Sequence, residues 1–296
     1  MFRLIKESDI KFMNIRRIPI IISTLLIIIS LSSMIFKGFN FGIDFSSGYI
    51  VQLKFEEPTS VLNIEKRFFD NNIEDVTVQL YGSSKDVLIK LKDEDIFKKD
   101  NINNFLSNIF ANSEYTISKL EYVGAQVGSE LREKGEWAML IALFSILIYV
   151  AIRFELIYGL GAITALIHDV IITLGFFSLF SLTFDLSVLA AILAVIGYSL
   201  NDSIVVFDRI RENNIVLRKL SIFDVLNKSI NQTLSRTLVT SLTTLLVIIS
   251  LLLFGGDAVK NFSIAMFIGI IIGTYSSIFV ASSSLSYFGI KRPEES

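Results

Sequence analysis

Six long apolar segments constrain this chain more than any other feature of its sequence. A helix that crosses the hydrocarbon core of a bilayer needs about 20 mostly apolar residues. We expect transmembrane helices at 18–36, 137–152, 156–180, 186–207, 238–254 and 262–288. The composition agrees, because 52% of the 296 residues are hydrophobic and 19% are charged, which is too apolar for an ordinary soluble chain. The sequence therefore predicts a polytopic α-helical membrane protein.

The lysines and arginines that flank the segments predict their orientation, because cytoplasmic loops carry an excess of these residues. The short loops 181–185 and 255–261 contain one basic residue between them, Lys260. The opposite flanks hold Arg3, Lys6, Lys11, Arg16, Arg17, Arg153, Arg209, Arg211, Arg218, Lys219, Lys228, Lys291 and Arg292. We therefore expect residues 1–17 and 291–296 in the cytoplasm. No small-residue cleavage site follows the first segment, so we expect it to stay as a membrane anchor.

Residues 37–136 form a polar stretch on the opposite side of the membrane, long enough to fold in water. Alternating apolar residues predict strands at 49–55, 76–80, 87–91 and 115–122, and helical spacing predicts helices at 58–69 and 96–110. The order β-α-β-β-α-β is that of a ferredoxin-like unit. We expect a small α+β ferredoxin-like extracytoplasmic domain between the first two spans.

The connection between the fourth and fifth spans, near 209–235, carries apolar residues at helical spacing opposite polar ones. They are Ile222, Val225, Leu226 and Ile230. This pattern predicts an amphipathic cytoplasmic helix. Two placements fit it equally: flat on the membrane surface, or packed against the ends of the spans.

Several classes of function are disfavoured by what the sequence lacks. No cysteine is present, which excludes disulfides and thiolate metal sites. There is no phosphate-binding loop, no H-E-x-x-H motif and no Gly-rich dinucleotide loop, and the single histidine, His168, lies inside the third span. The net charge of -2 gives no reason to expect nucleic acid as a partner. We therefore expect no enzymatic activity, no cofactor and no metal site.

Ionisable groups inside the spans are the candidates for function, since each costs roughly 2.5–3.5 kcal/mol to insert. With their polar neighbours they are His168 and Asp169 in the third span, Tyr198, Ser199, Asn201 and Asp202 in the fourth, and Arg236 before the fifth. For His168 and Asp169, hydrogen bonding to neighbouring helices explains the residues as well as a direct function does. Gly269 and Gly273 form a G-x-x-x-G pattern, which permits close helix packing within the chain or with a partner.

Asp202 and Arg236 fall at similar depth, because the fourth span runs inward and the fifth outward, so we expect them within reach of each other. Tyr198 and Ser199 lie one turn before Asp202, on its face, where they are placed to hold water beside the carboxylate. A carboxylate that binds and releases a proton on opposite sides can convert proton flow into motion, with about 2.3 kcal/mol per charge for each 100 mV. A static bridge between Asp202 and Arg236 fits the same spacing.

Several motifs resemble the SecD and SecF proteins of the bacterial protein-export apparatus. They are 41–48 (F-G-I-D-F-S-S-G), 123–128 (V-G-A-Q-V-G), 153–155 (R-F-E), 168–170 (H-D-V), 196–212 (I-G-Y-S-L-N-D-S-I-V-V-F-D-R-I-R-E) and 235–237 (S-R-T). The last two are similar to the SecF branch of the family rather than to the SecD branch. Ser47 stands where the family usually has glycine. The motifs together cover essentially the whole chain.

The resemblance implies a fold like half of a resistance-nodulation-division transporter, completed by SecD and placed beside the SecYEG channel. It implies use of the proton gradient to promote export of a translocating polypeptide after SecA-driven insertion, with YajC, YidC and membrane lipids as further candidate partners. Asp202 and Arg236 match the family's proposed proton-pathway positions, and Gly42, Asp44 and Gly48 match its structural motif after the first span.

Two other classes of function remain open. One is a proton-coupled transporter of a small molecule or a lipid with the same half-fold, and the other is a passive scaffold. Periodicity and depth alone do not separate export from small-molecule transport. The long motif in the fourth span favours export.

Overall fold

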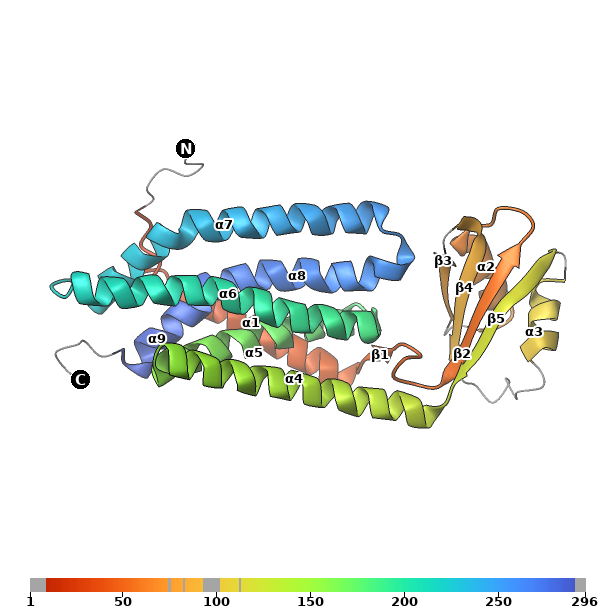
Figure 1. Cartoon of the computed structure of the whole chain (residues 1–296), viewed down its shortest axis with the longest axis horizontal. Helices are drawn as coiled ribbons and strands as arrows, with labels where there is room; N and C mark the ends of the chain where they lie inside the picture. Colours follow the sequence, from red (N-terminus) through yellow and green to blue (C-terminus); the bar gives the residue numbers. More distant parts are fainter. Residues whose placement is uncertain (1–8, 74–75, 82, 93–101, 112, 291–296) are drawn as a thin grey trace.

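The computed structural model describes residues 9–73, 76–81, 83–92, 102–111 and 113–290. Long helices form one elongated bundle, and a small sheet domain extends from one end of it (Figure 1). The C-terminal helix lies at the opposite end of the bundle (Figure 1). The predicted architecture, a helical membrane protein with one small soluble domain, is confirmed.

Within the part of the chain that the structure describes, six helices are long and apolar enough to cross a membrane. The first five are α1 (Arg17–Phe36), α4 (Ala125–Arg153), α5 (Leu156–Leu179), α6 (Leu186–Val216) and α7 (Ile222–Phe254). The sixth consists of α8 (Lys260–Ser276), a π-helical turn (Ser277–Ala281) and α9 (Ser282–Phe288). The six predicted spans are therefore all present.

The second helix is longer than predicted. It begins at Ala125, inside the stretch 37–136 that the sequence assigns to the soluble domain. Its first turns are polar, and the exposed pair Glu130 and Lys134 lies at i, i+4 spacing with the charged atoms 2.7 Å apart. Such pairs stabilise a helix that projects into water. The helix therefore follows the last strand of the sheet domain almost directly.

The expected amphipathic segment near 209–235 is not a separate helix, because α7 begins at Ile222 and continues without a break into the fifth span. Leu226 is fully buried in the same cluster as Met13. The Met13 N–H donates to Asn227 Oδ1 at 2.8 Å. The packed placement is therefore correct and the surface placement is wrong, because the rest of the chain already covers the apolar face of this segment.

The sheet domain has the predicted order of elements. They are β2 (Gly48–Phe55), α2 (Val61–Asp70), β3 (Val76–Tyr81), β4 (Ser83–Lys92), α3 (Ile102–Ile109) and β5 (Tyr115–Val123). The strand order is β3-β4-β2-β5, with every neighbouring pair antiparallel. The predicted ferredoxin-like arrangement is confirmed. The predicted helix at 96–110 begins outside the described residues.

The core of the sheet domain explains why the alternating pattern predicts its strands. Val51, Leu53 and Ile89 are fully buried from alternate positions of β2 and β4. They belong to one cluster with Phe68 of α2 and Phe110, which follows α3. Because successive residues of a strand point to opposite faces, one face meets the helices and the other carries the polar residues.

Candidate functional site

The motif at 41–48 fastens the sheet domain to one end of the bundle. β1 (Asn40–Phe41) pairs in parallel with β6 (Thr183–Phe184), which lies in the loop between α5 and α6. The Gly42 N–H donates to the Phe184 carbonyl at 2.9 Å. Neither strand was predicted, because a strand of two residues has no periodicity to detect.

Asp44 contacts both the bundle and the sheet. Its Oδ2 accepts the N–H of Leu186, the first residue of α6, at 3.2 Å. Its Oδ1 lies 3.9 Å from Lys90 Nζ of β4. Asp185 is the N-cap of α6 and accepts the Val188 N–H at 3.0 Å. Two carboxylates thus stabilise the positive end of α6, and one of them comes from the connection to the sheet domain.

Gly48 begins β2 at a point where the sheet leaves no room for a side chain. A Cβ atom there would collide with the carbonyl oxygen of Leu91 and would lie 2.9 Å from Ile43 Cγ2. Ser47 does not need to be glycine, because its φ is not positive. Close packing therefore explains the glycine at position 48.

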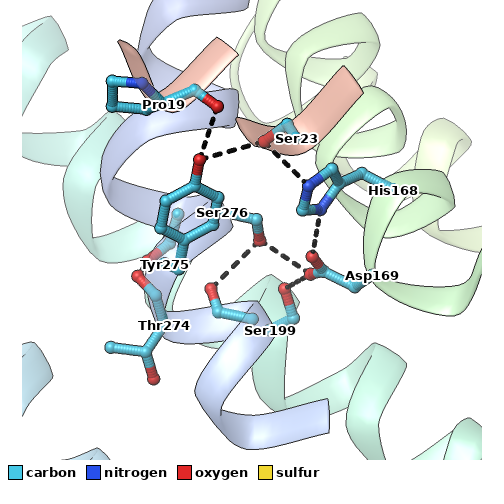
Figure 2. Close-up of polar contacts among 10 residues, drawn as sticks. Pro19, Ser23, His168, Asp169, Ser199, Thr274, Tyr275 and Ser276 are labelled. Atoms are coloured by element: carbon cyan, nitrogen blue, oxygen red, sulfur yellow. Dashed lines mark hydrogen bonds and ion pairs between the residues drawn. The ribbon is translucent and has the colours of Figure 1, made fainter. Parts of the chain in front are cut away.

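A network of polar side chains inside the bundle surrounds His168 and Asp169 of α5 (Figure 2). His168 Nδ1 and Asp169 Oδ1 are 2.8 Å apart. Asp169 Oδ2 accepts hydrogen bonds from Ser199 Oγ of α6 at 2.5 Å and from Ser276 Oγ of α8 at 2.7 Å. The two side chains of the pair are 3% and 1% exposed. Asp169 is therefore a buried carboxyl group with three partners, as a buried polar group requires.

A line of contacts continues from His168 to α1 and α8 (Figure 2). His168 Nε2 lies 3.0 Å from Ser23 Oγ, and Ser23 Oγ lies 3.1 Å from the Tyr275 hydroxyl. That hydroxyl donates to the Pro19 carbonyl at 2.6 Å. The imidazole also stacks on the Tyr275 ring, with 6.1 Å between the centroids. The pair on α5 is thus connected to α1, α6 and α8.

The sequence of contacts Ser23, His168, Asp169 is also that of a serine-hydrolase triad. Acyl transfer needs, in addition, N–H donors directed at an oxyanion. Ser23 lies inside α1, where each backbone N–H is bonded to the carbonyl one turn back. The arrangement therefore suits proton transfer between side chains rather than acyl transfer.

Gly269 and Gly273 bring α8 close to α6, so the G-x-x-x-G pattern acts within the chain. A Cβ at Gly273 would lie 3.0 Å from Ser199 Cβ and 3.6 Å from Asp169 Oδ2. A Cβ at Gly269 would lie 3.0 Å from Val195 Cβ. Without side chains here, the two helices approach closely enough for both to present hydroxyl groups to the same carboxylate.

Asp202 is a second buried carboxylate, 2% exposed. Its hydrogen bond is a long one, from Ser241 Oγ of α7 at 3.5 Å, and Ser241 Oγ lies 2.7 Å from Thr274 Oγ1 of α8. Arg236 is exposed, and in the described part of the chain no ion pair joins it to Asp202. Arg236 nevertheless lies close enough for its charge to act on the Asp202 carboxyl group, so the two residues are within reach of each other but form no ion pair in this conformation. Arg236 and Ser241 are five positions apart, so they lie roughly 140° apart around the helix, and only Ser241 faces inward.

The other residues of the predicted site in the fourth span point in different directions. Ser199 donates to Asp169 and not to Asp202. The Tyr198 hydroxyl is buried and has no hydrogen-bond partner among the described residues. Asn201 is exposed. The single site that the sequence suggests is therefore two polar centres, which α6 connects.

Ser23, Tyr275 and Ser276 belong to the site but were not predicted. Hydroxyl groups are common in apolar helices because they can bond to the backbone of their own helix. Nothing in their spacing separates these three from the other serines and tyrosines of the spans. The one weak signal is that Tyr275 and Ser276 stand within three residues after the G-x-x-x-G pattern.

A pocket of about 430 Å³ lies between α1, α5 and α9, and His168 forms part of its wall. Its lining combines apolar residues, which are Pro19, Ile20, Ile27, Ile167, Phe279 and Val280, with the polar residues Ser23, Thr24, Thr164, His168, Ser283, Ser284 and Tyr287. The Ser283 hydroxyl is buried without a partner among the described residues. Pro19 near the start of α1 and Tyr287 near the end of α9 also line the pocket. It therefore extends from the middle of the bundle toward the end far from the sheet domain.

Two parts of the chain match known protein families. Residues 102–291 match the family described as protein export membrane protein SecD/SecF, C-terminal, and residues 32–59 match the SecD/SecF GG motif. The chain belongs to the SecD/SecF family. The GG motif of SecD/SecF proteins covers the segment that holds the sheet domain against α6, and the C-terminal region covers the carboxyl groups of both polar centres, Asp169 and Asp202.

Curated SecD/SecF relatives align over nearly the whole chain. The protein translocase subunit SecF of Pseudomonas aeruginosa is 46% identical over 286 residues, which are 97% of this chain and 94% of the relative. The protein translocase subunit SecF of Calditerrivibrio nitroreducens is 50% identical over 282 residues, 93% of each chain. The predicted resemblance to the SecF branch of the SecD/SecF family is confirmed.

Among solved SecD/SecF structures, SecDF from Thermus thermophilus, described as a translocon-associated membrane protein, matches with a TM-score of 0.78 and 39% identity. SecDF in a super-membrane-facing form matches with a TM-score of 0.76 and 38% identity. The matches cover 93% and 97% of this chain, and 38% and 39% of the SecDF chains. This SecD/SecF chain thus spans about two fifths of the solved SecDF proteins.

Proposed function

We propose that this chain is the SecF-type subunit of a Sec protein translocase in the inner membrane. In this proposal it works with SecD and uses the proton gradient to promote protein export after SecA-driven insertion. The near full-length identity to SecF relatives supports the assignment to the translocase. The likeness to a part of the longer SecDF chains supports SecD as the subunit that completes the bundle.

The proton-coupled part of the proposal depends mainly on one observation: α6 holds a buried carboxylate and is also fastened to the sheet domain. Asp202 is buried, and among the described residues it has a single, long hydrogen bond. Ionising a carboxylate with so little compensation is costly in a low-dielectric environment, so its charge depends on the conformation around it. The first N–H of the same helix is bonded to Asp44. A shift of α6 on proton binding at Asp202 is thereby transmitted to the sheet domain.

Coupling of this kind requires at least two bundle conformations in which Asp202 has different contacts. The membrane potential supplies about 2.3 kcal/mol per charge for each 100 mV, which is enough to bias such an equilibrium. We assign Arg236 to the same pathway. Its charge already acts on Asp202 although its side chain is exposed on α7, and a direct contact between the two belongs to the second conformation.

We place both termini in the cytoplasm and the sheet domain in the periplasm, on the basis of the lysine and arginine distribution. In that orientation the sheet domain is on the side where an exported polypeptide emerges, beside the soluble part of SecD. SecYEG, YajC and YidC are the further protein partners that we propose, with membrane lipids around the spans.

Export of a reporter protein into membrane vesicles that contain this chain, SecD and the channel tests the proposal. Asp202→Asn keeps the size of the side chain and one acceptor oxygen but cannot release a proton. We expect this variant to lose the gain in export that the proton gradient produces. Asp208→Asn is the matched control, because Asp208 is an exposed carboxylate further along the same helix. It is expected to keep the full gain.

The outcomes separate the parts of the proposal. If native vesicles export the reporter equally well with and without a gradient, proton coupling is wrong. If Asp202→Asn keeps the full gain at matched expression, Asp202 is not the coupling residue. Loss of the gain in both variants would point to a general effect of charge on α6 and would count against a specific role of Asp202.

A further inference from the structure

The contacts around His168 allow the protons they hold to be counted. Four contacts form a line: Asp169 to His168, His168 to Ser23, Ser23 to the Tyr275 hydroxyl, and that hydroxyl to the Pro19 carbonyl. Each contact needs one proton between its two atoms. The two hydroxyl groups supply one proton each, and the carbonyl supplies none. The remaining two must come from the pair of His168 and Asp169.

Two distributions of these protons satisfy all four contacts. In one, both ring nitrogens of His168 carry a proton and Asp169 is a carboxylate. In the other, only Nε2 is protonated and Asp169 is a carboxylic acid that donates to Nδ1. Asp169 Oδ2 accepts from Ser199 and Ser276 equally well in either case. Both distributions leave the pair with no net charge.

With one proton fewer, the line cannot be completed. The ordinary neutral imidazole that donates from Nδ1 to a carboxylate has a bare Nε2, so Ser23 must donate to it. The Tyr275 hydroxyl donates to Pro19, and the two hydroxyl oxygens then face each other at 3.1 Å without a proton between them. Removal of the proton therefore breaks a contact between α1 and α8.

The surroundings offer little to stabilise the pair after it loses a proton. The side chain from α1 that faces it is Ser23, and the titratable groups nearest in the network are Tyr275 on α8 and Asp202, one turn from Ser199 on α6. α9 contributes Tyr287 to the pocket that His168 lines. No lysine or arginine lines that pocket among the described residues. A net negative charge would therefore be buried without a cation beside it.

We propose that the His168–Asp169 pair is a proton-binding site, that this structure is its proton-loaded form, and that the pocket between α1, α5 and α9 is the route by which the proton exchanges with water. On release, the pair passes one proton to a water molecule in the pocket, and the contact between Ser23 and Tyr275 is lost. The site then couples proton release to a weaker attachment of α1 to α8, which keep the bond from the Tyr275 hydroxyl to the Pro19 carbonyl. The use of that movement in export rests on the proposed function, whereas the protonation itself does not.

His168 is the only histidine of the chain, so nitrogen-15 labelling of histidine reports on this site alone. The full-length protein, purified through a tag without histidine and placed in lipid nanodiscs, gives the protonation of both ring nitrogens by NMR at neutral pH. We expect Nε2 to be protonated. A bare Nε2 with a protonated Nδ1 would overturn the proposal. A bare Nδ1 supports it when infrared spectra show a protonated carboxyl group that Asp169→Asn lacks, and overturns it when they do not.

Substitution on α1 tests whether the line of contacts holds the second proton. Ser23→Ala removes two of the four contacts, so the pair then needs only one proton, and we expect Nε2 to lose its proton at neutral pH. Thr24→Val is the matched control, because Thr24 lines the same pocket but its hydroxyl donates to the carbonyl of Ile20. The control should give the native spectrum. Identical spectra for Ser23→Ala and the native protein would overturn the proposed role of the line. These spectra do not depend on export, so they test the protonation of the pair independently of the proposed function.

Discussion

Replacing Gly269 by alanine tests the contact that holds α8 against α6. The new Cβ would lie 2.7 Å from Val195 Cγ1 and 3.0 Å from Val195 Cβ, whereas ordinary contacts begin near 3.4 Å. The new Cβ would also collide with Val195 Cγ2, and every staggered rotamer of the valine leaves at least one methyl group on this side. The two helices must therefore separate by roughly 0.7 Å at this point, because that is the difference between 2.7 and 3.4 Å.

The matched control is Gly197→Ala on the exposed side of α6, where a Cβ meets nothing within 4 Å. Both substitutions gain about the same helix propensity, up to about 1 kcal/mol, so this term cancels between them. Overpacking typically costs about 1–3 kcal/mol. We therefore expect the Gly269→Ala protein to be less stable than the Gly197→Ala protein by about 1–3 kcal/mol.

Unfolding in mixed micelles, followed as the denaturing detergent is increased, measures this difference. Adding Val195→Ala to Gly269→Ala removes both γ methyl groups and should restore part of the loss, which a double-mutant cycle would show as a favourable coupling. Equal stability of the two alanine variants, or a cycle without coupling, would refute the packing argument.

Two further predictions concern the sheet domain and its attachment. Asp44→Ala removes the carboxylate that accepts the Leu186 N–H, and we expect a loss of about 0.5–2 kcal/mol, seen as faster amide hydrogen exchange at the start of α6, while Asp44→Asn, which keeps an acceptor oxygen, should lose less. Phe68→Ala removes a fully buried ring that packs 5.8 Å from the Phe110 ring, and we expect about 3–5 kcal/mol less stability of the sheet domain, seen as faster proteolysis within it, while the exposed Phe69→Ala should change little.

The sequence was sufficient to predict the six spans, the order of elements in the sheet domain and the family. Each of these depends on information that is local along the chain. A run of apolar residues as long as the bilayer is thick needs no partner to be recognised, and the alternation at 49–55 follows from the geometry of one strand. The motifs at 41–48 and 196–212 are continuous segments.

The helix boundaries were predicted less well, because a helix can continue from the bilayer into water without a break. The first turns of α4 and α7 are polar enough to look like parts of soluble segments, yet they continue the spans as one helix. Ion pairs at i, i+4 spacing in α4 and contacts of α7 with Met13 stabilise these extensions. The length of an apolar run predicts only the part of a helix that lies in the bilayer.

The arrangement of the site depended on tertiary structure. The sequence identified the buried ionisable residues, but it did not show that Ser199 faces Asp169, that Asp202 meets Ser241, or that Arg236 points outward. These relations depend on the rotation of each helix about its axis and on how closely two helices approach. Both are set by packing at glycines and other small residues, which leave no periodic signal in the chain.

The sequence by itself determined which segments cross the membrane, which segment folds outside it, and which ionisable residues lie in apolar spans, where burying them costs free energy. What only the tertiary structure decided is which of those residues share protons. A hydrogen bond requires two atoms within about 3 Å, and the residues bonded to His168 or Asp169 come, with that pair, from four helices spread over most of the chain.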